Sequence, residues 1–348
     1  MQNISVALTS CGGKVIPGIV ECLRAESEYD FHVVGVDMDE RAVGKYFVDA
    51  FYSVPHGLSE KYIDCMLDVT RREDVDVIVP LSDEEARSLS KAQERFVEEG
   101  VSIVCSDHET VSMASNKGTL LSALEREGVE VPDFDEVSTL SELDRTIEAL
   151  GYPDRDLVLK PAQARGGRGF WRLTNDRNER ELTLGERCLQ TISYETLRSM
   201  LDGEESLPPL VVMEYLGGTD YNVDVLADDG EAVYTMPIER IEPDAGPVEV
   251  GHIVHNEQID VMADQITSAL EFNYNINIEL AYRTPDDQGN PLVYEINPRV
   301  SGPIAMHAEA GVNLLLYGIL MSLGKSVPRN EEYVDTLSHR CWREVYPK

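Results

Sequence analysis

Positive charge, and lysine above all, is scarce in this sequence. The chain has 348 residues, and its 30 Lys and Arg residues are outnumbered by 64 Asp and Glu residues, which gives a formal net charge of -34. Most of the carboxylates therefore have no opposite charge to pair with. A surface of this sign repels phosphate backbones and anionic lipid headgroups. The composition predicts a protein that binds neither nucleic acid nor a membrane surface.

The excess of carboxylates has two interpretations. It suits a protein that is solvated in concentrated salt, because salt screens the self-repulsion within a few ångströms. We therefore expect a halophilic protein, and the alternative is a merely acidic bacterial enzyme. Neither interpretation bears on the fold or the activity, since charge balance determines solubility and not architecture.

Closely spaced cysteines and long apolar runs are also missing. The six cysteines are scattered without a CxxC spacing, which predicts reduced thiols and no zinc site. No apolar run approaches the roughly 18 residues that a bilayer-spanning helix needs. We therefore expect a cytoplasmic protein that is neither secreted nor anchored.

The predicted elements divide the chain into three parts. Residues 1–110 alternate β-branched runs with amphipathic segments, including one helix over residues 84–98, and this order predicts a parallel sheet covered on both faces. Residues 111–209 have the pattern of a small α+β lobe with a polar excursion. Residues 210–348 are mainly strands. The expected fold class is α/β and α+β.

The first candidate site is the turn at residues 9–14, between the first strand and a helix. Its glycines and the helix N-terminus would suit an anion, but the spacing lacks the GxGxxG pattern. A tight turn without a ligand is the favoured alternative, because sharp turns also need glycine, and Cys11 is then a packed turn residue. Carboxylates follow other predicted strand ends, where open parallel sheets bind ligands, at Asp37, Asp39, Asp83 and Glu84. Asp83 could equally cap a helix.

Two lysines and a glycine-rich turn follow in the middle of the chain. Lys117 opens a predicted helix, and Lys160 ends an apolar strand that leads into the turn at residues 164–170. A lysine that is buried at a strand end needs an anionic partner. Successive glycine amides can wrap phosphate oxygens. A flexible hairpin loop is the simpler alternative.

A linker and two late strands carry further polar groups. Backbone groups at residues 211–221 could bind an adenine edge, and Asp220 could accept both ribose hydroxyls. Glu295 and Asn297 are two apart on a predicted strand, so they share a face. With Glu279 on a neighbouring strand they form an oxygen cluster of the kind that Mg²⁺ prefers when it is shared with phosphates. Glutamates paired with surface arginines would look similar.

Taken in order, these residues resemble the ATP-grasp superfamily, in particular its branch of carbamoyl-phosphate-synthase-like proteins and carboxylate-amine ligases. The resemblance covers essentially the whole chain. It implies an ATP-grasp fold preceded by a Rossmann-like N-terminal domain. The sequence departs from the family at Met213, where many members have glutamate, and at residues 272–275, which lack a usual glycine.

The resemblance implies a role for each candidate residue. Lys117 and Lys160 would hold the ATP phosphates under the loop that contains Gly166, Gly167 and Gly169. Adenine would contact Met213, Glu214 and Leu216, and the ribose would contact Asp220. Two Mg²⁺ ions, with Mn²⁺ as an alternative, would be coordinated by Glu279, Glu295 and Asn297. Arg299 and Lys160 would be catalytic, with Arg299 beside the transferred phosphoryl group.

The implied activity is that of an ATP-dependent ligase. It would activate a small-molecule carboxylate as an acyl phosphate and couple it to an amine, either an amino acid or ammonia, without a Ser or Cys nucleophile. Carbamoyl-phosphate-type synthesis and a non-catalytic ATP-binding subunit are the alternatives, and a homodimer is compatible with the resemblance. The acceptor site would include residues 297–307, and the further candidates are Arg240, His252, His255, Ser301, Gly302 and His307. An isolated histidine is more often structural.

Overall fold

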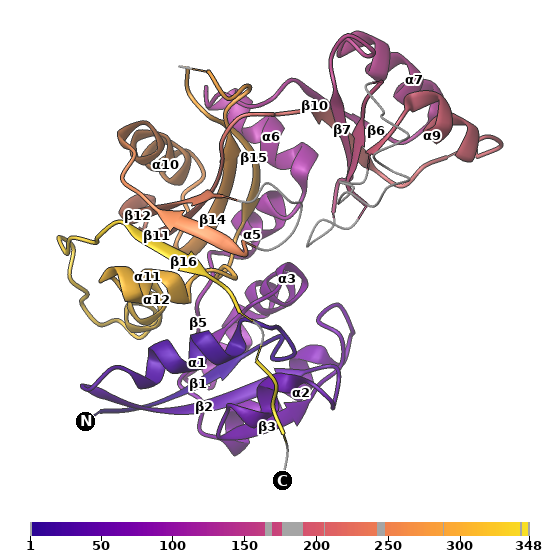
Figure 1. Cartoon of the computed structure of the whole chain (residues 1–348). Helices are drawn as coiled ribbons and strands as arrows, with labels where there is room; N and C mark the ends of the chain where they lie inside the picture. The colour runs from indigo at the N-terminus through magenta and orange to yellow at the C-terminus, as the bar shows by residue number, and fades with distance from the viewer. Residues whose placement is uncertain are drawn as a thin grey trace.

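Figure 1 shows the computed structural model of the chain, which describes residues 2–163, 169–175, 191–204, 206–241, 248–287, 289–341 and 343–346. The described strands form three sheets, of five, five and six strands. The predicted fold class, α/β and α+β, is confirmed. Gly166 and Gly167 lie outside the described residues.

The N-terminal domain is a parallel sheet with the order β3-β2-β1-β4-β5. Its strands are β1 (Gln2–Leu8), β2 (Tyr29–Asp37), β3 (Ala50–Ser53), β4 (Val77–Val79) and β5 (Ser102–Ile103), and its helices are α1 (Ile16–Arg24), α2 (Tyr62–Arg72), α3 (Asp83–Lys91) and α4 (Gln93–Glu98). The central strands are apolar without alternation because helices cover both faces of the sheet.

The expectation of one helix over residues 84–98 is wrong, because the helix breaks at Ala92. The Ala92 amide donates to the carbonyl oxygen of Leu89 at 3.0 Å, three residues back, and its φ of -104° and ψ of 14° leave the helical region. The apolar spacing continues through the break. It therefore predicts the buried face of both helices but not the interruption.

Phe96 and Val97 offer a matched test of this domain's core. Phe96 is fully buried, whereas its neighbour Val97 is 62% exposed. We expect Phe96→Ala to lower the free energy of unfolding by about 3–5 kcal/mol, because it leaves a cavity in a close-packed core. Val97→Ala should change it by less than about 0.5 kcal/mol. Urea unfolding of both variants measures the difference, and equal midpoints would contradict the assigned packing.

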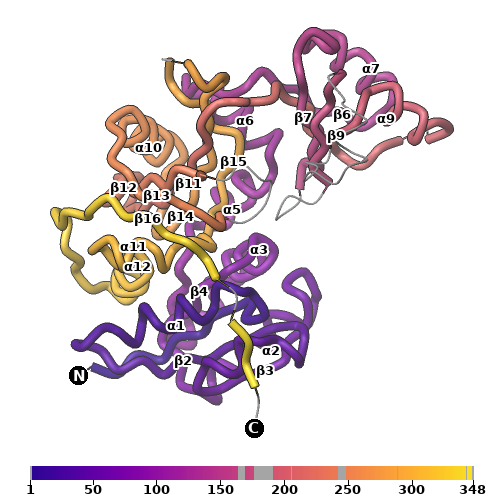
Figure 2. The backbone as a smooth tube through the Cα atoms, in the orientation of Figure 1, coloured from indigo at the N-terminus to yellow at the C-terminus, as the bar shows by residue number. Residues whose placement is uncertain are grey.

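The small lobe carries a mainly antiparallel sheet with the order β6-β10-β7-β8-β9, in which β8 and β9 pair in parallel. Its elements are β6 (Phe134–Val137), α7 (Leu140–Ala149), β7 (Leu157–Pro161), β8 (Trp171–Leu173), β9 (Thr191–Ile192), α9 (Tyr194–Met200) and β10 (Leu210–Glu214). Two helices, α5 (His108–Ala114) and α6 (Lys117–Arg126), lead from the N-terminal domain to this lobe (Figure 2). A capping box between Thr139 and Glu142 fixes the start of α7.

The C-terminal lobe is built on a sheet with the order β15-β14-β11-β12-β13-β16. Its elements are β11 (Asp220–Asp228), β12 (Glu231–Arg240), β13 (Val250–Ile253), α10 (Glu257–Ala269), β14 (Tyr274–Ala281), β15 (Leu292–Asn297), α11 (Ala305–Ala310), α12 (Leu314–Ser322) and β16 (Thr336–His339). Helix α12 is apolar on all sides because it lies between this lobe and the N-terminal domain. Ile19, Leu314 and Ile319 belong to one shared core.

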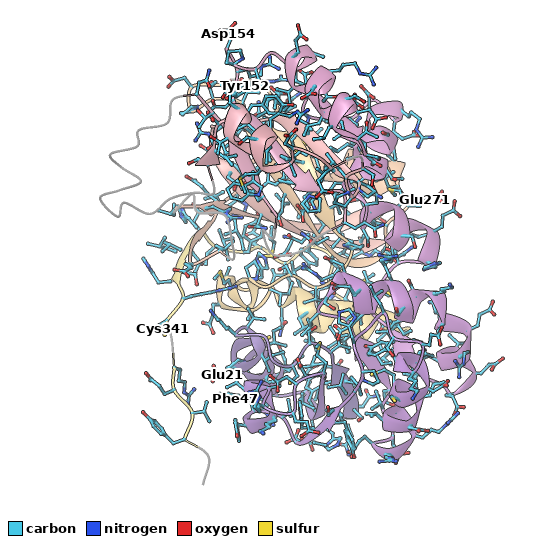
Figure 3. The ribbon with its side chains drawn as sticks, turned by 90° about the vertical axis from the view of Figure 1, so that its right-hand side faces the viewer. Glu21, Phe47, Tyr152, Asp154, Glu271 and Cys341 are labelled. Atoms are coloured by element: carbon cyan, nitrogen blue, oxygen red, sulfur yellow. The ribbon has the colours of Figure 1, made fainter. Side chains whose placement is uncertain are left out.

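The last described residues run back along the N-terminal domain. Figure 3 shows the segment around Cys341 passing beside Glu21 and Phe47. Arg343 pairs with Glu21 at 3.3 Å, and its guanidinium lies 6.0 Å from the centroid of the Phe47 ring. The first and last parts of the sequence are thus in contact. None of the described helices is long and apolar enough to cross a bilayer.

Candidate active site

Two lysines from different elements converge on the carboxylate of Glu295. The distance from Lys117 Nζ to Glu295 Oε2 is 3.3 Å, and from Lys160 Nζ to the same oxygen it is 4.0 Å. Their side chains are only 8% and 13% exposed, and that of Glu295 is 17% exposed. Two lysine side chains gathered in such a dry place suit the phosphates of a polyanionic ligand.

Local structure brings the two lysines together. Asn116 caps α6 by accepting from the Thr119 amide at 3.0 Å, so Lys117 is the first helical residue. The Lys117 amide donates to the carbonyl oxygen of Ala162 at 2.9 Å, just beyond the end of β7. This bond fixes the start of α6 beside the strand that carries Lys160.

The oxygen donors lie on two paired strands of the C-terminal lobe. Glu279 on β14 is directly opposite Glu295 on β15, and Asn277 is opposite Asn297. The amide of Asn297 donates to Glu279 Oε1 at 3.0 Å. The expectation that Glu279 and Glu295 lie on neighbouring strands is confirmed, and Glu295 and Asn297 share the face that the twofold spacing predicted.

Arg299 extends this cluster to the N-terminal domain. Its Nη2 donates to Asn297 Oδ1 at 3.0 Å, and its Nε lies 3.1 Å from Asp83 Oδ1. Asp83 is the first residue of α3, and Ser82 occupies the N-cap position. The capping role for Asp83 is therefore wrong, because its carboxylate faces Arg299 across the two domains.

The sequence analysis missed Tyr294, whose hydroxyl donates to Asp220 Oδ1 at 2.8 Å and also lies 3.3 Å from Glu279 Oε2. Lys160 Nζ lies 4.5 Å from its ring centroid, within the range of a cation–π contact. Strict alternation would turn Tyr294 away from the face of Glu295. However, Leu280 pairs with Val293 while Glu279 pairs with Glu295, so Tyr294 is the extra residue of a β-bulge.

Burial dominates the electrostatics of these groups. Desolvation raises the pKa of Glu295 above its ordinary value, although the nearby Lys117 opposes the shift. Desolvation likewise lowers the pKa of Lys160, and the charge of Glu295 opposes it. Both shifts have the same physical origin, since each charged form loses water that the protein only partly replaces. A bound ion or phosphate would supply the missing partners.

Asp220 lies at the start of β11, next to the same cluster. Arg240 Nε is 3.4 Å from Asp220 Oδ2, so one of the proposed acceptor residues lies beside it. Desolvation raises the pKa of the Asp220 carboxyl, with Arg240 as the main opposing charge. The structure thus brings together Lys117, Lys160, Asp220, Glu279, Glu295, Asn297 and Arg299.

The linker after β10 is held mainly by Glu214. Its side chain is 4% exposed and lies 3.2 Å from Arg283 Nη2, and its amide donates to the carbonyl oxygen of Asp133 at 2.9 Å. A contact from Glu214 to adenine would therefore come from its carbonyl group. Met213 is buried in a cluster that includes Val158. Leu216 is half-buried in the linker.

Gly169, the described member of the glycine loop, needs to be glycine. Its φ is +73°, and a Cβ there would lie 2.7 Å from Pro161 Cγ. Any side chain would both strain the backbone and clash with the end of β7.

The turn at residues 9–14 is filled by the protein's own carboxylate. Glu85 accepts from the Thr9 hydroxyl at 2.6 Å, the Ser10 hydroxyl at 2.8 Å and the Ser10 amide at 3.2 Å. The Gly12 amide also donates to a carboxylate of the protein, Asp37 Oδ2, at 2.6 Å, so these contacts support the turn without a ligand. Cys11 is fully buried, and burial raises the pKa of its thiol to about 12. Its environment suits a packed residue and not a nucleophile.

The candidate histidines lie in three different environments. His255 stacks on Tyr333 with 4.1 Å between the ring centroids, and His252 lies on β13. His307 is fully buried, and its Nε2 is 2.8 Å from Asp224 Oδ2. Ser301 donates to the same carboxylate at 2.8 Å, whereas Gly302 is only partly buried. Ser301 and His307 therefore lie behind the cluster.

The donor chemistry fits Mg²⁺ bound together with a nucleotide. Glu279 and Glu295 offer carboxylate oxygens and Asn297 offers an amide oxygen on one face. Within the part of the chain that the structure describes, no group of three His, Cys, Asp or Glu residues could hold a metal by itself. Mg²⁺ typically takes only one or two carboxylates and obtains its other ligands from phosphates and water.

Two family models match separate parts of the chain. The one described as "ATP-grasp in the biosynthetic pathway with Ter operon" matches residues 206–341, which contain Glu279, Glu295, Asn297 and Arg299. The one described as "PylC-like, N-terminal domain" matches residues 6–104. The chain belongs to the ATP-grasp superfamily. The family predicted from the sequence is thus confirmed.

Curated relatives of this ATP-grasp chain are much longer proteins. It is 22% identical over 277 residues to the carbamoyl phosphate synthase large chain of Clostridium acetobutylicum, covering 76% of this chain and 24% of the relative. It is 26% identical over 228 residues to the same protein of Mycobacterium bovis, covering 62% of this chain and 18% of the relative. The chain thus spans about a quarter or less of the length of these relatives.

Solved structures match over nearly the whole ATP-grasp chain. N5-carboxyaminoimidazole synthetase from Staphylococcus aureus, complexed with ADP, has a TM-score of 0.70 and 17% identity, covering 96% of this chain and 81% of that one. L-amino acid ligase from Bacillus licheniformis has a TM-score of 0.66 and 20% identity, covering 93% and 75%. At this identity the similarity shows the fold. The predicted ATP-grasp fold is therefore confirmed.

Proposed function

We propose that this protein is an ATP-dependent ligase that activates a small-molecule carboxylate as an acyl phosphate and joins the acyl group to an amine. The observation that carries the proposal is the convergence of Lys117 and Lys160 on Glu295, opposite Glu279. This is the charge pattern that a metal-bound triphosphate needs. The solved structure named L-amino acid ligase supports an amino acid as one substrate.

The chemistry follows from the weakness of a carboxylate as an electrophile, since its charge repels nucleophiles. A carboxylate oxygen forms a bond to the γ-phosphorus while the bond between that phosphorus and the β–γ bridging oxygen breaks, and ADP leaves. The amine nitrogen then forms a bond to the acyl carbon while the bond between that carbon and the phosphate oxygen breaks. Inorganic phosphate leaves, and the proton that the nitrogen loses passes to solvent. Neither step needs a covalent enzyme intermediate.

Each side chain has a role in this scheme. Lys117 and Lys160 hold phosphate oxygens and offset their charge, and Arg299 stabilises the transferred phosphoryl group. Asp220 binds the ribose, and the linker of Met213, Glu214 and Leu216 borders the adenine. Glu279, Glu295 and Asn297 would hold Mg²⁺, which supplies charge neutralisation at the phosphates when it is bound. Mn²⁺ could replace it, and the resemblance favours two ions.

Two alternatives are less well supported. Carbamoyl-phosphate-type synthesis is the activity named for the curated relatives, but this chain spans only 24% of the first of them. A non-catalytic ATP-binding subunit would need neither a buried Lys117–Glu295 pair nor a second carboxylate at Glu279, because binding adenine requires no metal. The buried charges favour the ligase.

The test is an ADP-release screen over amino acids and small carboxylates, run in both low and high potassium chloride because of the acidic composition. We expect the correct acid alone to give slow ADP release, and hydroxylamine to trap the acyl group as a hydroxamate. Adding the correct amine should raise the rate and abolish the hydroxamate. Tight ATP binding without turnover on any acid would favour the binding subunit instead.

A further inference from the structure

Asp224 is a buried carboxylate behind the proposed metal site, and three side chains donate to it. It is 1% exposed on β11. Its Oδ2 accepts from Ser301 at 2.8 Å and from His307 Nε2 at 2.8 Å, and its Oδ1 accepts from Asn277 Nδ2 at 3.2 Å. A carboxylate that receives donors on both oxygens acts purely as an acceptor.

The hydrogen bond to Asp224 is the polar contact that the structure shows for the His307 side chain. It is fully buried, and among the described residues its Nδ1 has no hydrogen-bond partner. Burying an imidazole with one nitrogen unsatisfied is costly. Such a cost points to a function for the group that the ring holds in place.

The carboxylate of Asp224 fixes the direction of the next amide. Because Asp224 can only accept, Asn277 must turn its NH₂ toward it and its oxygen away. That oxygen then accepts from Asn222 Nδ2 at 3.2 Å and from Asn297 Nδ2 at 3.4 Å. Asn277 is 2% exposed, so water does not compete for these bonds.

The orientation passes on to Asn297, one of the proposed metal ligands. Its NH₂ group donates to Asn277 Oδ1 and to Glu279 Oε1, the latter at 3.0 Å. The amide oxygen therefore faces the opposite way, where it accepts from Arg299. An amide oxygen has two lone pairs, and the second stays available for a cation.

We propose that Asp224, held by His307 and Ser301, is a positioning residue that orients the Asn297 amide through Asn277 and so sets the Mg²⁺ affinity of the nucleotide site. The inference rests on the proposed ATP site but on no particular substrate. It assigns a role to a carboxylate that touches neither nucleotide nor metal. Residues in this outer position commonly control metal affinity.

The decisive variant is Asp224→Asn, which keeps the shape and reverses the relay. The new amide would turn its oxygen to His307 and Ser301 and its NH₂ to Asn277. Asn277 would then flip and present its NH₂ to the NH₂ of Asn297, which favours the reversed orientation of Asn297, with its NH₂ toward Arg299 and the metal. An NH₂ group cannot coordinate a cation.

The measurement is the Mg²⁺ concentration that gives half-maximal tight binding of a fluorescent ATP analogue to the full chain. We expect Asp224→Asn to raise it about tenfold or more. The matched control is Asp228→Asn, the same change four residues along β11, where the carboxylate is paired with exposed Arg329. It should leave the Mg²⁺ requirement within about twofold of the unchanged protein.

Asn277→Ala keeps the inference testable if Asp224→Asn does not fold. It interrupts the relay without adding a donor, so Asn297 loses its fixed orientation and the Mg²⁺ requirement should rise about threefold or more. A folded Asp224→Asn or Asn277→Ala variant with an unchanged Mg²⁺ requirement would overturn the inference. If the unchanged protein bound nucleotide without any response to Mg²⁺, the proposed function itself would fail, and the two failures are thus distinguishable.

Discussion

Glu295→Gln is expected to lower substrate-dependent ADP release about 10³-fold, because it removes the charge on which both lysines converge. Lys117 and Lys160 would then lose the carboxylate that they share at 3.3 and 4.0 Å in a nearly dry site. Removing one member of a buried ion pair is destabilising, by about 3 kcal/mol or more. We therefore expect this variant to lose stability as well as activity.

The control for Glu295→Gln is Glu309→Gln, the same substitution at an exposed position on α11. It should leave both the rate of ADP release and the thermal midpoint unchanged. A Glu295→Gln variant with more than about a tenth of the original rate would contradict a role in binding the metal-bound triphosphate.

Lys160→Met is expected to lose activity without losing stability. Methionine has a similar length and no charge, so contact with the phosphates is lost and ADP release should fall about 10²-fold or more. The pKa of Lys160 is lowered by burial, which means that folding disfavours its charged form. Glu295 would keep Lys117 at 3.3 Å, so its carboxylate retains a cation.

Thermal unfolding separates these two outcomes. We expect the midpoint of Lys160→Met to equal or exceed that of the unchanged protein, as is common where function has been favoured over stability. Lys91→Met, at an exposed position on α3, should change neither rate nor midpoint. A large loss of stability in Lys160→Met with full activity per folded molecule would show that Lys160 is structural.

Much of the candidate site was predictable because its signals are local. The spacing of Glu295 and Asn297 fixes their shared face, and a lysine at the end of the apolar strand at residues 157–160 can be recognised without knowing its partner. Asn116 before Lys117 is a helix-capping signal. Each of these inferences needs only the geometry of one strand or one helix end.

The missed features depend on contacts between distant parts of the chain. The bulge at Tyr294 breaks the twofold alternation, and the residue type at that position does not predict a bulge. Glu85 fills the first turn from 75 or more residues away. Likewise, Asp83 meets Arg299, and Asp224 meets His307, only after the sheets have packed.

The central claim is that Lys117, Lys160, Glu279 and Glu295 surround one metal-bound triphosphate. A crystal structure with Mn²⁺ and a non-hydrolysable ATP analogue tests it directly, because Mn²⁺ is located by its anomalous scattering. We predict a peak about 2–2.5 Å from carboxylate oxygens of both glutamates, with the terminal phosphate in contact with both lysines. A nucleotide bound elsewhere, or bound here with no metal at these carboxylates, would contradict the account.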